Sequence, residues 1–235
     1  MAFNPVGGLD PANAVLLPEA LAAARSLRAH LPSVSAGGIT RLYDHWTAGH
    51  LDQSDGQYNL MVDLNDATGS WQLLVTHDPR ANLVQNANEA FHTQNRNTGA
   101  LGVCLAGMFG ASPSNFAADA LQVHELHFLC ALNAVAAAAY NIDLSARFAQ
   151  HVHHAADDGS QIDRFGEFNL LTHGEVAVID LYPRDRWDLG TLVPIPAAVE
   201  QQLVAEQGHG MPSPAMRSAC GDALRLLSHR YKIAL

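Results

Sequence analysis

The segment 100–108 is apolar throughout, with the sequence ALGVCLAGM. A strand with one face in water alternates apolar and polar residues, whereas a strand covered on both faces does not. We therefore expect 100–108 to form a central strand of a sheet that has protein on both sides. Strand-forming residues at 39–43 predict a further strand, and two runs at 58–64 and 71–76, joined by a turn containing Asn, Asp and Gly, predict a hairpin.

Three other stretches have helical composition and spacing. Segment 12–30 predicts one or two short helices broken near Pro18. Segment 118–140 predicts a long helix, whose alanines at 134–139 permit close packing, and 214–229 predicts another. A chain of 235 residues suits one large domain with additions. We assign 1–38 to an N-terminal helical extension, 39–193 to the main domain, and 194–235 to a C-terminal helical extension packed on it.

Composition argues against several classes of protein. The formal net charge is −10, from 23 acidic and 13 basic side chains. This disfavours nucleic acid as a partner, because phosphate binding needs clustered Lys and Arg. No apolar run reaches the roughly 18–20 residues of a membrane span. The cysteines at 104, 130 and 220 are far apart and odd in number, so neither a disulfide framework nor a thiolate zinc site is expected. The N-terminus has no secretory signal pattern, and we expect synthesis in the cytoplasm without a signal peptide.

His45 lies where strand-forming residues give way to the small residues of 47–49. The carboxyl end of a strand is a usual place for chemistry, although a lone histidine beside a tryptophan is more often a packed core residue. His173 and Asp188 also lie beside Thr or Gly at expected element ends. Two histidines and a carboxylate are a common ligand set of catalytic zinc, with Asp180 and Asp185 as competing carboxylates.

Several segments occur together in one order, and in that order they resemble the zinc-dependent N-acetylmuramoyl-L-alanine amidases of the amidase-2/peptidoglycan-recognition-protein family. The resemblance runs from about 39 to 192, some two-thirds of the chain. The segments that carry it are 45–49, 58–62, His92 with 95–99, 101–103, 172–173 and 186–188.

The resemblance implies an α/β fold in which helices flank a central mixed sheet. It also implies hydrolysis of the amide between N-acetylmuramic acid and L-alanine of the stem peptide by a zinc-activated water. The family's zinc ligands fall on His45, His173 and Asp188. Asp188 is preferred to Asp185 because the segment 186–188 then reproduces the family's spacing between a basic residue and the last ligand. In members of the phage-lysozyme type, residues at the positions of Tyr58 and Arg186 assist catalysis.

Two departures from the family affect proton transfer. Related cytoplasmic amidases carry a catalytic Glu where this chain has Cys104 or Ala106, so that base is absent. Arg186 replaces a Lys. It stays charged and can stabilise an oxyanion, but it is no substitute for Lys as a proton donor. Tyr58 and Glu175 remain as candidate proton carriers.

Glu175 follows His173 by two residues, so on an extended segment both side chains would share a face. The alternative for Glu175 is a carboxylate that orients a ligand imidazole. His92 is expected to contact substrate or shuttle a proton, with a plain surface histidine as the alternative. We group Asn97 and Trp46 with it as candidate substrate contacts, although capping the loop is the more usual role for such an Asn. The histidines at 151, 153 and 154 fit a solvated face better than a metal site, because they lack a helical i, i+4 pair and an adjacent Glu.

Two other functions stay open at this stage. One is a peptidoglycan-binding module on the same scaffold that does not cut, and the other is a thiol hydrolase using Cys104 and His92. For the amidase, the substrate implies action on the cell wall in the periplasm, after release as a phage endolysin or injection as an antibacterial effector toxin. A cytoplasmic recycling enzyme is the remaining alternative. An injected toxin would need an immunity protein as partner.

Overall fold

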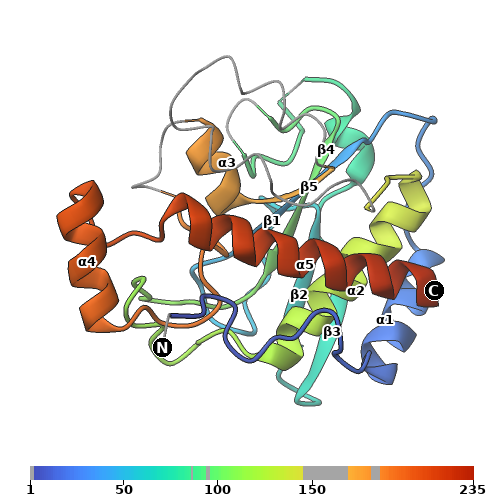
Figure 1. The fold of residues 1–235 in the computed structure, drawn as a ribbon. Coiled ribbons are helices and arrows are strands. Elements are labelled where there is room, and N and C mark those ends of the chain that lie inside the picture. The colour runs from blue at the N-terminus through green and yellow to red at the C-terminus, as the bar shows by residue number, and fades with distance from the viewer. Residues whose placement is uncertain (1–2, 86, 94–95, 145–168, 181–185) are drawn as a thin grey trace.

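A computed structural model describes residues 3–85, 87–93, 96–144, 169–180 and 186–235. In this part of the chain, five strands form one sheet in the order β3-β2-β4-β1-β5 (Figure 1). β3 is antiparallel to β2, and all other neighbouring strands are parallel. The expected α/β fold with a mixed sheet is therefore confirmed. The strands are β1 Arg41–Trp46, β2 Leu60–Asn65, β3 Ser70–Val75, β4 Ala100–Leu105 and β5 Leu170–Thr172.

β4 is the central strand that its apolar sequence predicted, and all six of its residues are buried. β1 differs from expectation, because it begins at Arg41 and continues through His45 to Trp46. Pairing with β4 extends as far as Trp46 and Leu105, and this ladder keeps the end of β1 extended. His45 therefore lies inside the strand, one residue before its end.

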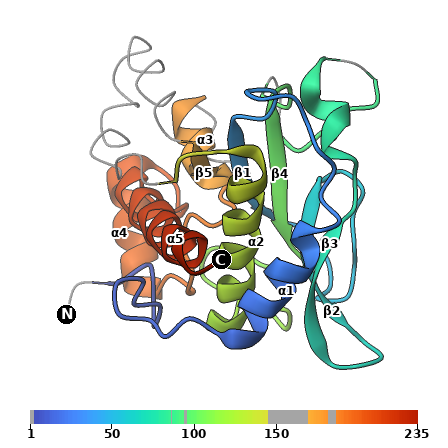
Figure 2. The same ribbon diagram turned by 90° about the vertical axis from the view of Figure 1, so that its right-hand side faces the viewer.

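Helices α1 Pro18–Arg28, α2 Val123–Tyr140 and α5 Pro214–Ala234 pack together on one face of the sheet (Figures 1 and 2). α2 begins later than predicted, at a capping box formed by Gln122 and Glu125. α1 begins at Pro18, so this proline starts the helix instead of interrupting it. The remaining described helices are η1 Pro79–Leu83, α3 His173–Ile179 and α4 Ala197–Gln207.

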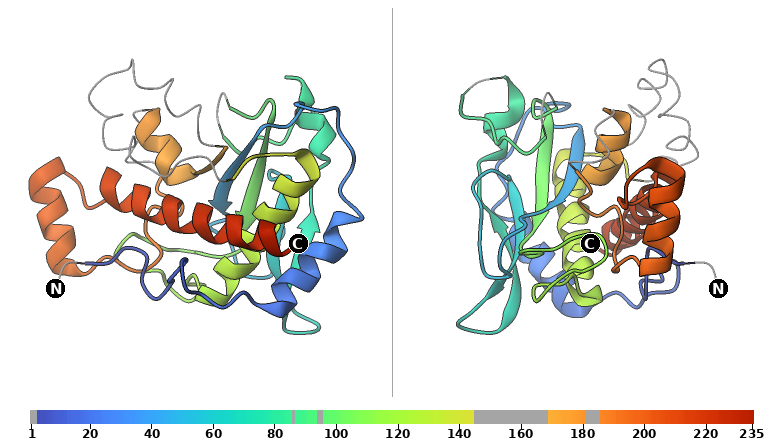
Figure 3. Two further views of the ribbon diagram at one scale, coloured as in Figure 1. Left: turned by 45° about the vertical axis from the view of Figure 1, so that its right-hand side comes forward. Right: turned by 90° about the vertical axis from the view of Figure 1, so that its left-hand side faces the viewer.

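Both terminal regions join the core of the sheet. Leu224 and Leu227 of α5 and Ala24 of α1 belong to the same buried cluster as the inner residues of β1, β2 and β4. The hydroxyl of Tyr231 in α5 accepts a hydrogen bond from the Leu17 amide at 2.9 Å, which ties the two regions together. Figure 3 shows α5 lying across α2, with α1 beside them. Among the described residues, no helix has the combined length and hydropathy that crossing a membrane requires.

The two faces of β1 have different surroundings, because successive side chains of a strand point to opposite faces. Leu42 and Trp46 belong to the main core under the helices. Tyr43 packs with residues of β5 and α3, so the face that it shares with His45 is the opposite one. That face is the one on which the candidate site is built.

Candidate metal centre

Three side chains converge at the carboxyl ends of β1 and β5. His45 Nδ1 lies 3.1 Å from His173 Nδ1, and His173 Nδ1 lies 3.1 Å from Asp188 Oδ2. The third side of the triangle, from His45 Nδ1 to Asp188 Oδ2, is 3.6 Å. Within the described residues, these three form the group that could hold a metal ion.

Strand register brings the two histidines together. In the parallel pair of β1 and β5, Asp44 lies opposite Thr172, so the residue after each, His45 and His173, are neighbours. Thr172 then ends the strand and caps α3, because its side chain accepts a hydrogen bond from the Glu175 amide. His173 is thus fixed as the first residue of a helix.

Asp188 is held against the same helix start by a backbone contact. The Gly174 amide donates to the Asp188 carbonyl at 2.9 Å. A Cβ atom at Gly174 would lie 2.9 Å from that carbonyl oxygen, so glycine permits the close approach. On the other side of the turn, the Trp187 ring packs edge-on against Trp46 at 4.5 Å. The last ligand therefore lies on a turn that is anchored at both ends.

Arg217 of α5 supports both ligand-bearing segments from behind, and the sequence did not point to it. Its side chain is fully buried, and Nη1 donates to the carbonyls of Gly174 at 3.0 Å and Arg186 at 2.6 Å. Its Nε donates to the Pro212 carbonyl at 2.8 Å. Burial lowers the pKa of Arg217 to about 10, so the guanidinium stays charged at neutral pH. Gly174 follows His173 directly, which makes α5 part of the support of the site.

The donor atoms fit a divalent metal ion. In a tetrahedral zinc site with bonds of about 2.0–2.2 Å, neighbouring ligand atoms are about 3.3–3.6 Å apart. The observed separations of 3.1, 3.1 and 3.6 Å are close to these values. Three protein ligands leave a fourth position open, as catalytic sites require.

Electrostatics favours the ligand forms of His45 and Asp188. Burial lowers the pKa of His45 to about 4, and the neighbouring His173 adds to this effect while Asp188 opposes it. His45 is therefore neutral at physiological pH. Burial alone would raise the pKa of Asp188, but the electrostatic interaction with His173 and hydrogen bonds with both histidines lower it below its usual range. A neutral imidazole and an ionised carboxylate are what a metal needs.

A cavity of about 340 Å³ adjoins the ligands. His173 lines it, together with the exposed ring of Phe91 and three of the predicted residues. These three are His92, Asn97 and Arg186. The structure thus brings His92, Asn97 and Arg186 to one cavity beside the candidate metal centre.

His92 packs directly on β4 at Gly102. A Cβ atom at Gly102 would lie 2.4 Å from Cγ of His92, so only glycine leaves room for the ring. His92 is buried, and burial together with the nearby His45 and His173 lowers its pKa well below the usual value. The ring lies 5.6 Å from that of His45.

We expect Gly102→Ala to displace His92 while the three ligands stay in place. The added methyl overlaps the ring, and overpacking of this kind costs roughly 1–3 kcal/mol of stability. Thermal unfolding should show a modest loss of stability, and zinc titration should still show a bound ion. Complete loss of zinc binding in Gly102→Ala would contradict the conclusion that Gly102 makes room only for His92. Gly56→Ala is the matched control, because no atom lies within 4 Å of its Cβ position.

Tyr58 lies beside the ligands, with its ring 5.2 Å from that of His45 and its hydroxyl 3.4 Å from the Trp46 carbonyl. Burial raises the pKa of Tyr58 above its usual range, so the hydroxyl keeps its proton. Trp46 was grouped with the substrate contacts, but the structure places its side chain in the core. It is 5% exposed and packs against Trp187 and Phe116, because its position in β1 points to the helical face.

Glu175 differs most from its expected position. The segment after His173 is helical and not extended, so a residue two positions later points in a different direction. Its carboxylate accepts from Arg225 Nη1 and Nη2, each at 2.8 Å, and from the Thr172 amide at 3.0 Å. Glu175 is fully buried in this ion pair and lies outside the group of metal-binding atoms.

The remaining predicted residues have other surroundings. Asp180 ends α3 and forms an ion pair with Arg96. Cys104 is fully buried on β4, opposite His45 in the register, and burial raises the pKa of its thiol well above the usual value. Asp185 and the histidines at 151, 153 and 154 lie outside the described residues.

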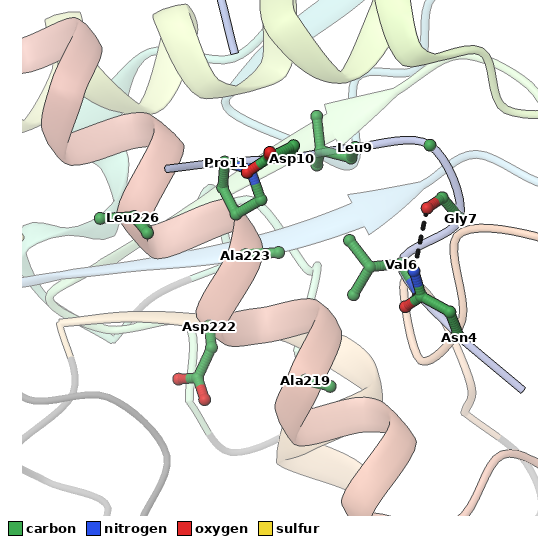
Figure 4. A pocket seen from close by; sticks show the side chains of 11 residues that line it. Asn4, Val6, Gly7, Leu9, Asp10, Pro11, Ala219, Asp222, Ala223 and Leu226 are labelled. Carbon is green, nitrogen blue, oxygen red and sulfur yellow. Dashed lines mark hydrogen bonds between the residues drawn. The ribbon is translucent and has the colours of Figure 1, made fainter. Parts of the chain in front are cut away.

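A larger cavity, of about 540 Å³, lies between the N-terminal segment and α5 (Figure 4). Its walls are mostly small and apolar side chains such as Val6 and Ala223. Its two carboxylates are already engaged, Asp10 with Asn13 and Asp222 with Arg225. None of the predicted site residues lines it, so we assign the chemistry to the smaller cavity.

No protein-family model, curated protein or solved structure matches this chain. The fold and the site together define an α/β protein with a candidate divalent-metal centre at one edge of its sheet.

Proposed function

We propose that this protein is a zinc-dependent peptidoglycan amidase that hydrolyses the amide bond between N-acetylmuramic acid and L-alanine. The observation that carries the proposal is the convergence of His45, His173 and Asp188 next to a cavity. The substrate is inferred from the resemblance of the segments around these residues to amidase-2 enzymes. The grouping of the donor atoms and the resemblance of the segments both indicate these three residues as ligands.

Zinc is the ion that this donor set favours. Two imidazole nitrogens and one carboxylate oxygen at near-tetrahedral spacing suit Zn²⁺ better than Mg²⁺ or Ca²⁺, which prefer more oxygen ligands. When bound, such an ion supplies Lewis acidity and makes water a usable nucleophile at neutral pH.

The side chains of the cavity act on the substrate carbonyl. Water adds to the carbonyl carbon, the C–N bond then breaks, and the L-alanine amine leaves with a proton. Arg186 lines the cavity and offers a permanent positive charge to the oxygen that becomes negative. His92 and Asn97, in the same wall, provide polar groups that orient the muropeptide.

Tyr58 acts as a hydrogen-bond donor in this scheme. It cannot serve as a base, because its raised pKa keeps the phenol protonated. A protonated phenol beside His45 can donate to the substrate carbonyl or to the departing nitrogen.

Replacing Tyr58 with Phe should therefore lower kcat by roughly 10²-fold, the effect of removing one positioned donor. Bound zinc and thermal stability should stay near wild type, because the ring keeps its packing. Initial rates of stem-peptide release, with zinc content measured on the same preparation, check this. Wild-type turnover in Tyr58→Phe would exclude Tyr58 from the reaction.

The binding module without catalysis is the second candidate, and one observation favours it. Cys104 on β4, or Ala106 just after it, stands where the cytoplasmic amidases that the chain resembles have their catalytic Glu. A protein of this kind would bind muropeptides in the cavity but release no stem peptide. The thiol hydrolase has less support, because Cys104 is buried with a raised pKa and a nucleophilic thiol must be ionised and accessible.

A single digestion separates these three functions. Purified protein is incubated with cell-wall sacculi before chelation by EDTA, after chelation, and after zinc is restored. The amidase predicts release, loss and recovery of stem peptides. A thiol hydrolase would be unaffected by EDTA, and a binding module would retain muropeptides without releasing peptides under any condition.

The proposed substrate sets where the protein acts. Peptidoglycan lies outside the cytoplasmic membrane, so an endolysin or an injected effector of this kind would work in the periplasm. In an effector, the partner would be an immunity protein that covers the cavity lined by His92 and Arg186. Rescue of periplasmic toxicity by a co-expressed neighbouring gene would identify such a partner.

A further inference from the structure

The hydroxyl of Thr93 lies between two imidazoles of the site. Its Oγ1 is 3.1 Å from His45 Nε2 and 3.1 Å from His92 Nδ1. Thr93 is 1% exposed, so water does not compete for these bonds. Its backbone amide donates to Asn97 Oδ1 at 2.8 Å, which holds the backbone that carries the hydroxyl. The contact links a candidate metal ligand to a residue that lines the cavity.

We propose that Thr93 is a positioning residue that couples metal binding at His45 to the hydrogen-bonding state of His92. The inference rests on the metal centre of the proposed function and adds a positioning residue to the same site. Sequence reasoning did not single out Thr93, although a hydroxyl residue directly after His92 was a visible signal.

The positions of the protons set the direction of these hydrogen bonds. A metal ion bound through His45 Nδ1 leaves the proton of the neutral imidazole on Nε2. Nε2–H then donates to Thr93 Oγ1, since that oxygen is the partner at 3.1 Å. The single hydroxyl proton of Thr93 is left to donate to His92 Nδ1. His92 must then carry its own proton on Nε2.

The direction of these hydrogen bonds decides which ring nitrogen of His92 carries the proton. His92 Nε2 is buried and has no hydrogen-bond partner among the described residues, and the His92 side chain lines the cavity wall. A metal ion bound at His45 would therefore set the tautomer of a histidine whose side chain forms part of the cavity wall.

Without metal, the chain of hydrogen bonds can run in the opposite direction. His92 Nδ1–H would donate to Thr93, and Thr93 to His45 Nε2, which leaves the proton of His45 on Nδ1. That nitrogen faces Asp188 Oδ2 at 3.6 Å. The two directions differ in the tautomers of both histidines, and tautomers can be measured.

The test compares Thr93→Val, which keeps the shape but loses the hydroxyl, with Thr93→Ser, which keeps the hydroxyl. Zinc affinity is measured by competition with a chromogenic chelator, and histidine tautomers by ¹⁵N NMR with and without zinc. We expect Thr93→Val to bind zinc about 10- to 100-fold more weakly, with Thr93→Ser close to wild type. In zinc-loaded wild type, His92 should carry its proton on Nε2, and in Thr93→Val its tautomer should no longer respond to zinc.

Equal zinc affinity in Thr93→Val and wild type would overturn the proposal, as would a His92 tautomer that does not change with zinc in wild type. Thermal unfolding of both variants shows that each is folded before comparison. Neither measurement uses peptidoglycan, so absence of amidase activity alongside the expected affinities and tautomers would reject the proposed function alone.

Discussion

His45→Ala should lose both bound zinc and amidase activity. His45 is fully buried, and its Nδ1 is one of three donor atoms that lie 3.1–3.6 Å apart. Its replacement by Ala leaves only two ligands and an empty space where the imidazole was. Loss of the metal removes several kcal/mol of transition-state stabilisation, which corresponds to a rate lower by roughly 10³-fold or more. Zinc content and the rate of stem-peptide release, measured on one preparation, give the result.

His50→Ala is the matched control for this variant. His50 lies five residues further along the chain, its side chain is 56% exposed, and it pairs with Asp119. Its removal should leave zinc content and rate near wild type. Full turnover in His45→Ala, or equal losses in the two variants, would rule out a metal centre at His45.

The second large effect concerns stability. Arg225→Met should lower the free energy of unfolding by about 3–5 kcal/mol, because it leaves the carboxylate of Glu175 buried without its partner. Arg225 and Glu175 are both almost completely buried and share two hydrogen bonds of 2.8 Å. In a chain of this length, each kcal/mol shifts Tm by about 2–4 °C, so we expect Tm to fall by roughly 10 °C.

Two further variants make this prediction specific. Glu175→Gln combined with Arg225→Met removes both charges and should recover much of the lost stability. Arg80→Met breaks an exposed pair with Asp78 and should change Tm little. A fall in Tm for Arg225→Met no larger than that for Arg80→Met would contradict the structural role of the buried pair.

The sequence predicted those elements whose signal is local. The apolar segment 100–108 required a central strand, and β4 is that strand. Helical composition at 118–140 and 214–229 predicted α2 and α5. α2 begins later than predicted because the capping box at Gln122 decides its start, whereas α5 begins at the predicted Pro214 and continues to Ala234. His45, His173 and Asp188 could be grouped because each lies next to residues that end an element.

Features that depend on contacts between distant segments could not be predicted. Glu175 was placed on an extended segment, since nothing near it in the sequence shows that Arg225, fifty residues away, is its partner. Trp46 next to His45 suggested a substrate contact, but the pleat of β1 turns it toward the opposite face. Arg217 and Thr93 contact the site through hydrogen bonds to Gly174 and His45. These partners are distant in the sequence and become neighbours only in the folded chain.

The central claim is metal-dependent cleavage of one particular bond, and mass spectrometry of products formed in ¹⁸O-labelled water tests it most directly. The zinc-loaded protein, with His45, His173 and Asp188 as ligands, should release stem peptides that begin with a free L-alanine amine. One ¹⁸O atom should appear in the lactyl carboxylate of N-acetylmuramic acid, and metal-free protein should give neither product. Cleavage within the glycan or within the peptide, or the same products from metal-free protein, would contradict the assignment of this protein as a zinc amidase.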